Sequence, residues 1–342
     1  MALTIERRRI TARAPTADEL VATHIAGGRA AFVRRDGQIQ IVDLDSGAPV
    51  RSLIRPDATS VLLSPSGRHL LVRGPRGLSR ELISVDDGAS LVTFQRIGRL
   101  PQTVSAAFLV DRAGDEIVLL SREDLVLEGF RAGDAAPVFR IECRRPIAYY
   151  FATPVAMLDG DTIIALGSQP SESKDSFYRF SLALCRDDPA AAARMDPANT
   201  APAEYAYRVA VGPCGRDALV AFRDEQGDEQ EDDTLDDDEV NEDPLHGFSG
   251  LYVRRLADRV VVDRISYDAP IRSGAPLMAT ADAVIVARGD QVDVIARGAP
   301  EPDVLAITAG PGARYLLEPT TGTIFEVNAS GQIEAITARR EA

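Results

Sequence analysis

A polar turn between two apolar runs recurs along this chain and constrains its fold more than any other feature. Residues 61–74 read VLLSPSGRHLLVRG, and residues 209–222, VAVGPCGRDALVAF, carry Pro, Gly and Arg at matching places. Five further stretches have the same apolar–turn–apolar form. The seven turns fall near Gly28, Gly67, Gly114, Gly160, Gly215, Asp282 and Ala313. Self-similarity at a spacing of roughly 40–50 residues indicates repeated supersecondary units.

A second pair of strands is predicted after most of these turns. In GQIQIVDLDSGAPVRSLI (37–54) and RELISVDDGASLVTF (80–94), apolar and polar residues alternate on both sides of a short turn. Each unit therefore holds four short strands. A four-stranded antiparallel meander repeated seven times predicts an all-β fold, a seven-bladed β-propeller. Stacking the blades in a closed ring buries both faces of each sheet and protects its edges.

The repeat predicts one propeller domain over residues 1–342. The expected blades span residues 18–56, 57–96, 101–142, 146–204, 205–267, 268–300 and 301–338. The last blade is expected to hold four strands of its own. The segment Leu3–Ile10 alternates weakly, and it either adds an outer strand to that blade or replaces its final one.

Turn chemistry supports the hairpin at residues 64–67. Pro65 presets φ for the second position of a type I turn, and Gly67 takes the position at which a left-handed backbone is easiest. We therefore expect a positive φ at Gly67. Ala313 occupies the matching position in the last copy and lacks that freedom.

The charge of the chain is concentrated in one segment. The net charge is −14, and residues 224–243, DEQGDEQEDDTLDDDEVNED, hold 13 acidic and no basic residues, so the remainder is close to neutral. Low hydrophobicity and high charge favour a disordered, solvated insertion. The alternative is that the segment attracts a protein with a basic surface or mimics the charge of nucleic acid. The candidate partner-binding residues are Asp232, Asp233, Asp236, Asp237, Asp238 and Glu239.

The sequence predicts no catalytic residue, no metal site and no cofactor. His24, His69 and His246 are dispersed, and packing or surface roles are expected for all three. Nucleophile-elbow and phosphate-loop motifs are absent. An acidic chain is a poor nucleic-acid binder, and no apolar run is long enough to cross a membrane.

Other features bear on the compartment and the source. The three cysteines are too few and scattered for a disulfide framework. The first 15 residues do not have the pattern of a secretory signal. We therefore expect a cytoplasmic monomer. A bias to arginine, with Lys174 as the only lysine, is typical of a GC-rich bacterial genome.

The stretch IQIVDLDSGAPVRSL (39–53) resembles the third and fourth strands of a WD-repeat blade, and VLLSPSGRHLLV resembles the first and second. Val42 precedes Asp43 where that family has Trp-Asp, and no Gly-His dipeptide opens a blade. The turns also resemble the Ser-Pro-Asp-Gly hairpins of Tol-system periplasmic propellers. The resemblance implies a WD-repeat-like propeller as the fold and no specific activity. Because rigid propellers present loops on two rims and no catalytic groups are recognised, we expect a non-enzymatic platform for protein–protein interaction. The alternative is a propeller enzyme of the lactonase or quinone-dependent dehydrogenase class, with a site in the central channel.

Overall fold

The structure is a computed structural model in which every regular element is a β-strand. It describes residues 3–16, 19–74, 79–95, 106–110, 113–121, 126–134, 136–142, 150–158, 162–169, 174–181, 205–211, 217–223, 247–255, 261–272, 277–280, 282–288, 291–298, 304–308, 313–318 and 321–340. Within these ranges no residue lies in an α-helix. No helix there is long and apolar enough to span a membrane. The all-β prediction is confirmed.

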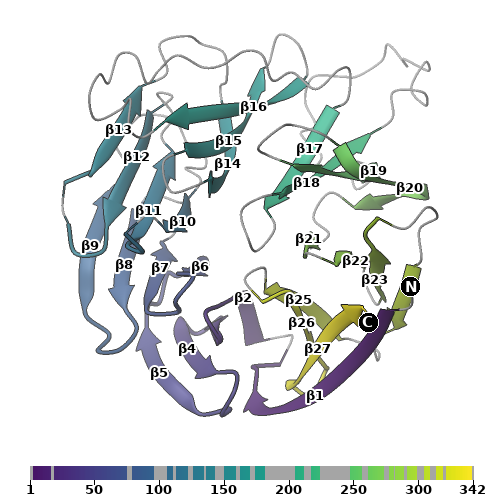
Figure 1. Cartoon of the computed structure of the whole chain (residues 1–342). Helices are drawn as coiled ribbons and strands as arrows, with labels where there is room; N and C mark the ends of the chain where they lie inside the picture. The colour runs from purple at the N-terminus through teal and green to yellow at the C-terminus, as the bar shows by residue number, and fades with distance from the viewer. Residues whose placement is uncertain are drawn as a thin grey trace, which may run out of the picture.

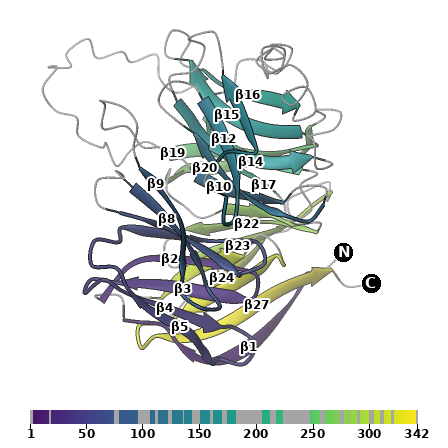
Figure 2. The same ribbon diagram turned by 90° about the vertical axis from the view of Figure 1, so that its left-hand side faces the viewer.

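The described strands form seven antiparallel sheets around a ring, the arrangement of a β-propeller (Figures 1 and 2). Blades one to three are β2 (Leu20–Ala26), β3 (Arg29–Arg34), β4 (Gln38–Asp43), β5 (Pro49–Ile54); β6 (Ser60–Leu63), β7 (His69–Arg73), β8 (Ser79–Ser84), β9 (Ser90–Gln95); and β10 (Ala106–Val110), β11 (Glu116–Ser121), β12 (Val126–Arg131), β13 (Phe139–Glu142). Blades four and five are β14 (Tyr150–Leu158), β15 (Thr162–Gln169), β16 (Lys174–Ser181); and β17 (Tyr205–Val211), β18 (Asp217–Arg223), β19 (Gly247–Arg255), β20 (Val261–Arg272). Blades six and seven are β21 (Leu277–Ala279), β22 (Ala283–Arg288), β23 (Gln291–Ala296), β24 (Val304–Thr308); and β25 (Arg314–Glu318), β26 (Thr323–Val327), β27 (Gln332–Arg340) with β1 (Leu3–Arg13).

The core lies between the blades. One apolar cluster joins Phe32 of blade one to Phe325 of blade seven, and another joins Ile41 of blade one to Leu70 of blade two. A third joins Leu71 of blade two to Phe130 of blade three. A blade such as blade one thus buries apolar side chains on both of its faces, which a sheet can do only with a neighbour on each side.

Strand β1 closes the ring by pairing with β27, from Leu3 opposite Arg340 to Ile10 opposite Ile333. The two ends of the chain lie side by side in Figure 1. The expectation that the last blade holds four strands of its own is therefore wrong. Since β1 supplies the outer strand, three strands from the C-terminal region complete blade seven.

Because β1 belongs to blade seven, two of the expected blade boundaries change. Strand β24 pairs with β23 in blade six, although it falls in the range expected for the last blade. Strand β20 continues to Arg272 within blade five, beyond the expected boundary at residue 267. Ala313 consequently lies between blades, and the first hairpin of blade seven turns around Gly322 instead.

The predicted turn geometry holds in the first three blades. Gly67 has φ +71°, and Gly28 and Gly114 are also positive, at +70° and +85°. We call residues 64–68, which join β6 to β7, the blade-two turn. Backbone amides of Leu44 and Val85, after the third strands of blades one and two, donate to carbonyls of the first hairpins in the same blades. The turns between the first and second strands and the turns after the third strands therefore lie on one rim of the propeller, which we call the turn rim.

Candidate functional site

Blade one holds the blade-two turn and the end of β6 that precedes it through three contacts. His24 Nδ1 accepts a hydrogen bond from the backbone N–H of Leu63 at 3.0 Å. Arg29 Nη1 donates to the carbonyl of Gly67 at 2.9 Å. The backbones themselves touch, because a Cβ at Gly27 would lie 2.3 Å from the Gly67 nitrogen. Since His24 accepts through Nδ1, the imidazole must be in the tautomer that carries its proton on Nε2.

Blade three holds the same turn through a buried carboxylate. Glu116 is 8% exposed, and its Oε1 accepts from the backbone N–H of Ser66 at 2.7 Å. Its Oε2 lies 2.7 Å from His69 Nδ1. Burial alone would raise the pKa of Glu116, but hydrogen bonds from His69, Ser66 and Ser64 outweigh it and lower the pKa to about 2. Glu116 is therefore ionised at neutral pH.

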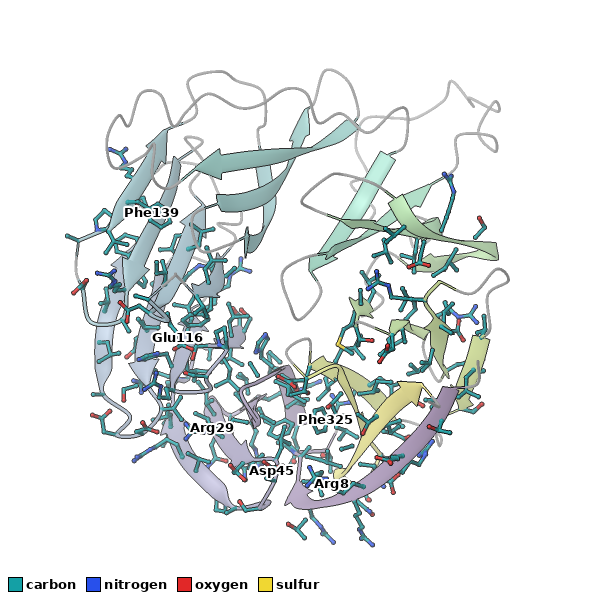
Figure 3. All side chains as sticks on the ribbon, in the orientation of Figure 1. Arg8, Arg29, Asp45, Glu116, Phe139 and Phe325 are labelled. Atoms are coloured by element: carbon teal, nitrogen blue, oxygen red, sulfur yellow. The ribbon has the colours of Figure 1, made fainter. Side chains whose placement is uncertain are left out.

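Three of the side chains at this turn occupy the same repeat position. Arg29, His69 and Glu116 are each the first residue of the second strand in blades one, two and three. Arg29 and Glu116, both labelled in Figure 3, reach toward blade two from opposite neighbours. The sequence analysis missed this set. Its signal was the repeat position directly after each glycine-containing turn, which carries a cation, an imidazole and a carboxylate in succession.

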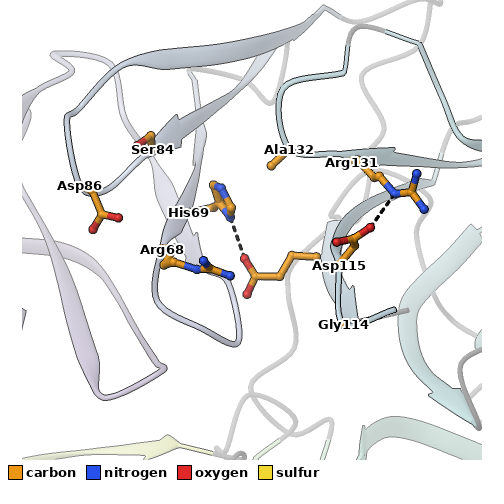
Figure 4. A pocket seen from close by; sticks show the side chains of 9 residues that line it. Arg68, His69, Ser84, Asp86, Gly114, Asp115, Arg131 and Ala132 are labelled. Carbon is orange, nitrogen blue, oxygen red and sulfur yellow. Dashed lines mark hydrogen bonds and ion pairs between the residues drawn. The ribbon is translucent and has the colours of Figure 1, made fainter. Parts of the chain in front are cut away.

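An open cavity of about 390 Å³ lies at the turn rim between blades two and three (Figure 4). Four turns build its walls. It is lined by Arg68, His69, Ser84, Asp86, Gly114, Asp115, Glu116, Arg131 and Ala132.

The charges around the cavity alternate in sign. Arg131 Nε pairs with Asp115 at 3.2 Å, and Asp86 lies 3.4 Å from Arg29 of blade one. The side chains of Asp86 and Asp115 are 64% and 54% exposed. Because these two carboxylates remain largely in water, they can also contact a bound molecule. Arg68 Nε donates to the Ser66 hydroxyl at 3.3 Å.

His69 can offer one ring nitrogen to a ligand. An ionised carboxylate only accepts hydrogen bonds, so Nδ1–H of His69 donates to Glu116. The side chain is 19% exposed and lines the cavity. In Figure 4 a dashed line leads from the His69 imidazole to its carboxylate partner, and this contact is the one between Nδ1 and Glu116 Oε2. Glu116 therefore orients the imidazole of His69 through Nδ1, and Nε2 is the ring nitrogen that can contact a ligand.

The other residues singled out from the sequence fare differently. The acidic residues Asp232, Asp233, Asp236, Asp237, Asp238 and Glu239, with the three cysteines and His246, lie outside the described residues. His24 and His69 lie in strands of different blades, as predicted. In the part of the chain that the structure describes, no three His, Cys, Asp or Glu side chains gather in a way that could hold a metal ion.

Comparison with known proteins supports the fold and leaves the family open. No family model matches the sequence, and no curated protein matches it. A structure titled Kuenenia stuttgartiensis hydrazine synthase is similar over 97% of this chain and 98% of its own, with a TM-score of 0.60 and 12% identity. Among solved structures, 1491 chains match, so this architecture is widely shared. At such low identity the likeness establishes the β-propeller fold alone.

Proposed function

We propose that this chain is a non-enzymatic platform for protein–protein interaction, built on a WD-repeat-like propeller, and that it docks a partner at the turn rim. The observation that carries the proposal is the open cavity between blades two and three. Its walls are turns, and one of them, the blade-two turn, is held by both neighbouring blades. A preorganised surface of this kind loses little entropy when a partner binds.

The partner we propose is a protein segment with a basic face. The exposed carboxylates of Asp86 and Asp115 lie at the cavity, and residues 224–243 contribute 13 acidic residues to the net charge of −14. A negative field attracts a basic partner and speeds its association. The proposal takes the chain as a cytoplasmic monomer.

Charge reversal at the cavity tests this docking site. Asp86→Lys combined with Asp115→Lys should weaken binding of a captured basic partner by at least about tenfold, because like charges would then meet. Asp45→Lys is the matched control, since Asp45 occupies the same turn position in blade one and is 82% exposed. Binding that is unchanged by the double reversal, or equally reduced by the control, would reject the cavity as the docking site.

The acidic stretch at residues 224–243 is a second proposed contact for the same partner. Replacing Asp232, Asp233, Asp236, Asp237, Asp238 and Glu239 by Asn and Gln removes six charges and keeps size and polarity. Binding should fall, and the loss should shrink at high salt, because exposed charges are screened over about 8 Å at about 0.15 M. Deletion of the stretch, joining Arg223 to Pro244, should leave the melting temperature unchanged. A partner that binds the neutralised protein as tightly as wild type would show that the stretch plays no part.

A second candidate function rests on the His69–Glu116 pair. An imidazole oriented by a carboxylate at an open cavity is the arrangement that a general base requires. Under this proposal the chain is a propeller-type enzyme of the lactonase or quinone-dependent dehydrogenase class. Metal analysis of the purified protein separates the two candidates, because a stoichiometric metal ion would favour the enzyme.

A further inference from the structure

Two arginines face each other at the end of blade two opposite the turn rim. Arg73 of β7 is the register partner of Arg80 of β8, so both side chains lie on one face of the sheet. Two residues along the same strands, Leu71 and Leu82 form the next pair on that face. These leucines pack with Phe130 of blade three. The arginine pair therefore lies on the side of blade two that faces blade three.

In the part of the chain that the structure describes, the two guanidinium groups share no counter-ion. Both residues are half-buried, and within the described residues neither side chain has an ion pair or a hydrogen bond. Arg73 Nε is buried without a partner. Burial and, second, the positive charge of Arg73 lower the pKa of Arg80 to about 10. The arginines are thus close enough to repel each other.

A buried carboxylate on the side of blade three that faces blade two is engaged within its own blade. Glu128 of β12 lies in the register row of Leu120, and its Oε1 pairs with Arg140 Nε at 3.4 Å. Arg140 is the register partner of Glu128 on β13, so this ion pair stays within blade three. Like charges placed directly opposite each other destabilise a sheet. An arrangement that conflicts with stability and has no compensating charge among the described residues points to a binding role.

We propose that Arg73 and Arg80 form a binding site for a phosphate group, bridged between the two guanidinium groups. Each guanidinium presents a planar fork of N–H donors that matches the oxygens of an oxyanion. At neutral pH a phosphate monoester or inorganic phosphate carries roughly 1.5 to 2 negative charges, whereas a carboxylate carries one. The phosphate therefore balances both arginines. The site lies away from the turn-rim cavity and is independent of the docking function proposed there.

Isothermal titration with inorganic phosphate, O-phosphoserine and acetate at equal ionic strength tests the site. Wild type should bind inorganic phosphate at one site, and the double variant Arg73→Gln and Arg80→Gln should bind it at least about tenfold more weakly, as expected when charge-assisted hydrogen bonds are lost. Arg8→Gln with Arg35→Gln is the matched control, because it also removes two positive charges, but from exposed positions elsewhere. The control should bind like wild type. Circular dichroism and the melting temperature check that every variant is folded.

The three ligands also define the source of the anion. Binding of both phosphate and O-phosphoserine supports a site for phosphomonoesters, and binding of inorganic phosphate alone supports a site for the free ion. Acetate binding of equal strength would overturn the proposal, because charge matching would then not matter. Phosphate binding that is absent in wild type, or unchanged in the folded double variant, would overturn it as well.

Discussion

At one end of blade two, the turn at residues 64–68 lies between a cation from blade one and a carboxylate from blade three. At the other end, Arg73 and Arg80 face each other across two strands without a counter-ion among the described residues. Strand β7 runs from one end to the other, and one apolar cluster fills the space between blades two and three. From this difference we infer that apolar packing holds the blades together at both ends. The charges differ: at the turn end they pair with each other, whereas at the arginine end they are arranged to bind a ligand.

The backbone contact at the turn end should carry the largest effect. Gly27→Ala should destabilise the protein by about 4 kcal/mol, since the new Cβ combines a left-handed backbone with overlap against blade two. Gly28→Ala is the matched control, because its φ is also positive but a Cβ there would meet nothing within 4 Å. It should cost about 1 kcal/mol. Urea unfolding measures both, and equal losses would show that the contact between the two turns contributes nothing.

Removal of the carboxylate should come next. Glu116→Ala should cost about 3 kcal/mol, since it removes a buried carboxylate, so that the backbone N–H of Ser66 and the imidazole of His69 both lose their acceptor.

The deficit of Glu116→Ala should depend on pH in a defined window. The pKa of Glu116 is lowered from 4.5 to about 2 in the folded protein, so its contribution is present above pH 4.5 and is lost as the pH falls toward 2. The stabilities of wild type and variant should therefore converge in acid. A deficit that stays constant from pH 7 to pH 3 would contradict this assignment.

A smaller pH effect is expected from the blade-one side of the turn. Burial lowers the pKa of His24 from 6.5 to about 4, so the folded protein binds fewer protons than the unfolded chain between these values. Stability should fall by about 2 kcal/mol as the pH drops from 6.5 to 4, after allowance for partial solvent exposure of the residue. His24→Asn keeps an acceptor near the Nδ1 position and does not titrate. Unfolding of this variant should lose the dependence on pH in that window, and a dependence equal to that of wild type would assign the titration to another group.

Substitution at the arginine end should change the free energy of unfolding in the opposite direction and by the smallest amount. Arg80→Gln should stabilise the protein by about 0.5 kcal/mol in phosphate-free buffer, because it removes repulsion between like charges and keeps part of the side chain's apolar stem. The gain should shrink as salt is raised. A loss of stability would mean that Arg80 has a structural partner and that the comparison between the two ends is wrong.

The fold could be predicted from the sequence because a propeller repeats its local pattern. Glycine-containing turns and alternating strands were sufficient to recognise the blades, and the positive φ of Gly67 followed from its turn position. The way the ring closes could not be predicted. Strand β1 pairs with β27 across nearly the whole chain. No local pattern indicates whether such a strand is an extra outer strand or the fourth strand of a blade.

The candidate site was missed for a related reason. Arg29, His69 and Glu116 are separated by some 40 residues each, and only stacking of neighbouring blades brings them to one turn. The arginine pair likewise depends on strand register, since six residues separate Arg73 from Arg80. The acidic stretch was conspicuous in the sequence, and its role stays a prediction.

The most direct test of the account compares Glu116→Gln with Arg80→Gln by urea unfolding, side by side, at pH 7, low salt and without phosphate. Each substitution neutralises one charge on the same seam between blades two and three and nearly preserves side-chain length or polarity. The account predicts opposite signs: a loss of about 1–2 kcal/mol for Glu116→Gln and a gain of about 0.5 kcal/mol for Arg80→Gln. Shifts of the same sign in the two variants would contradict the claim that one end of blade two is compensated internally and the other is left for an anion.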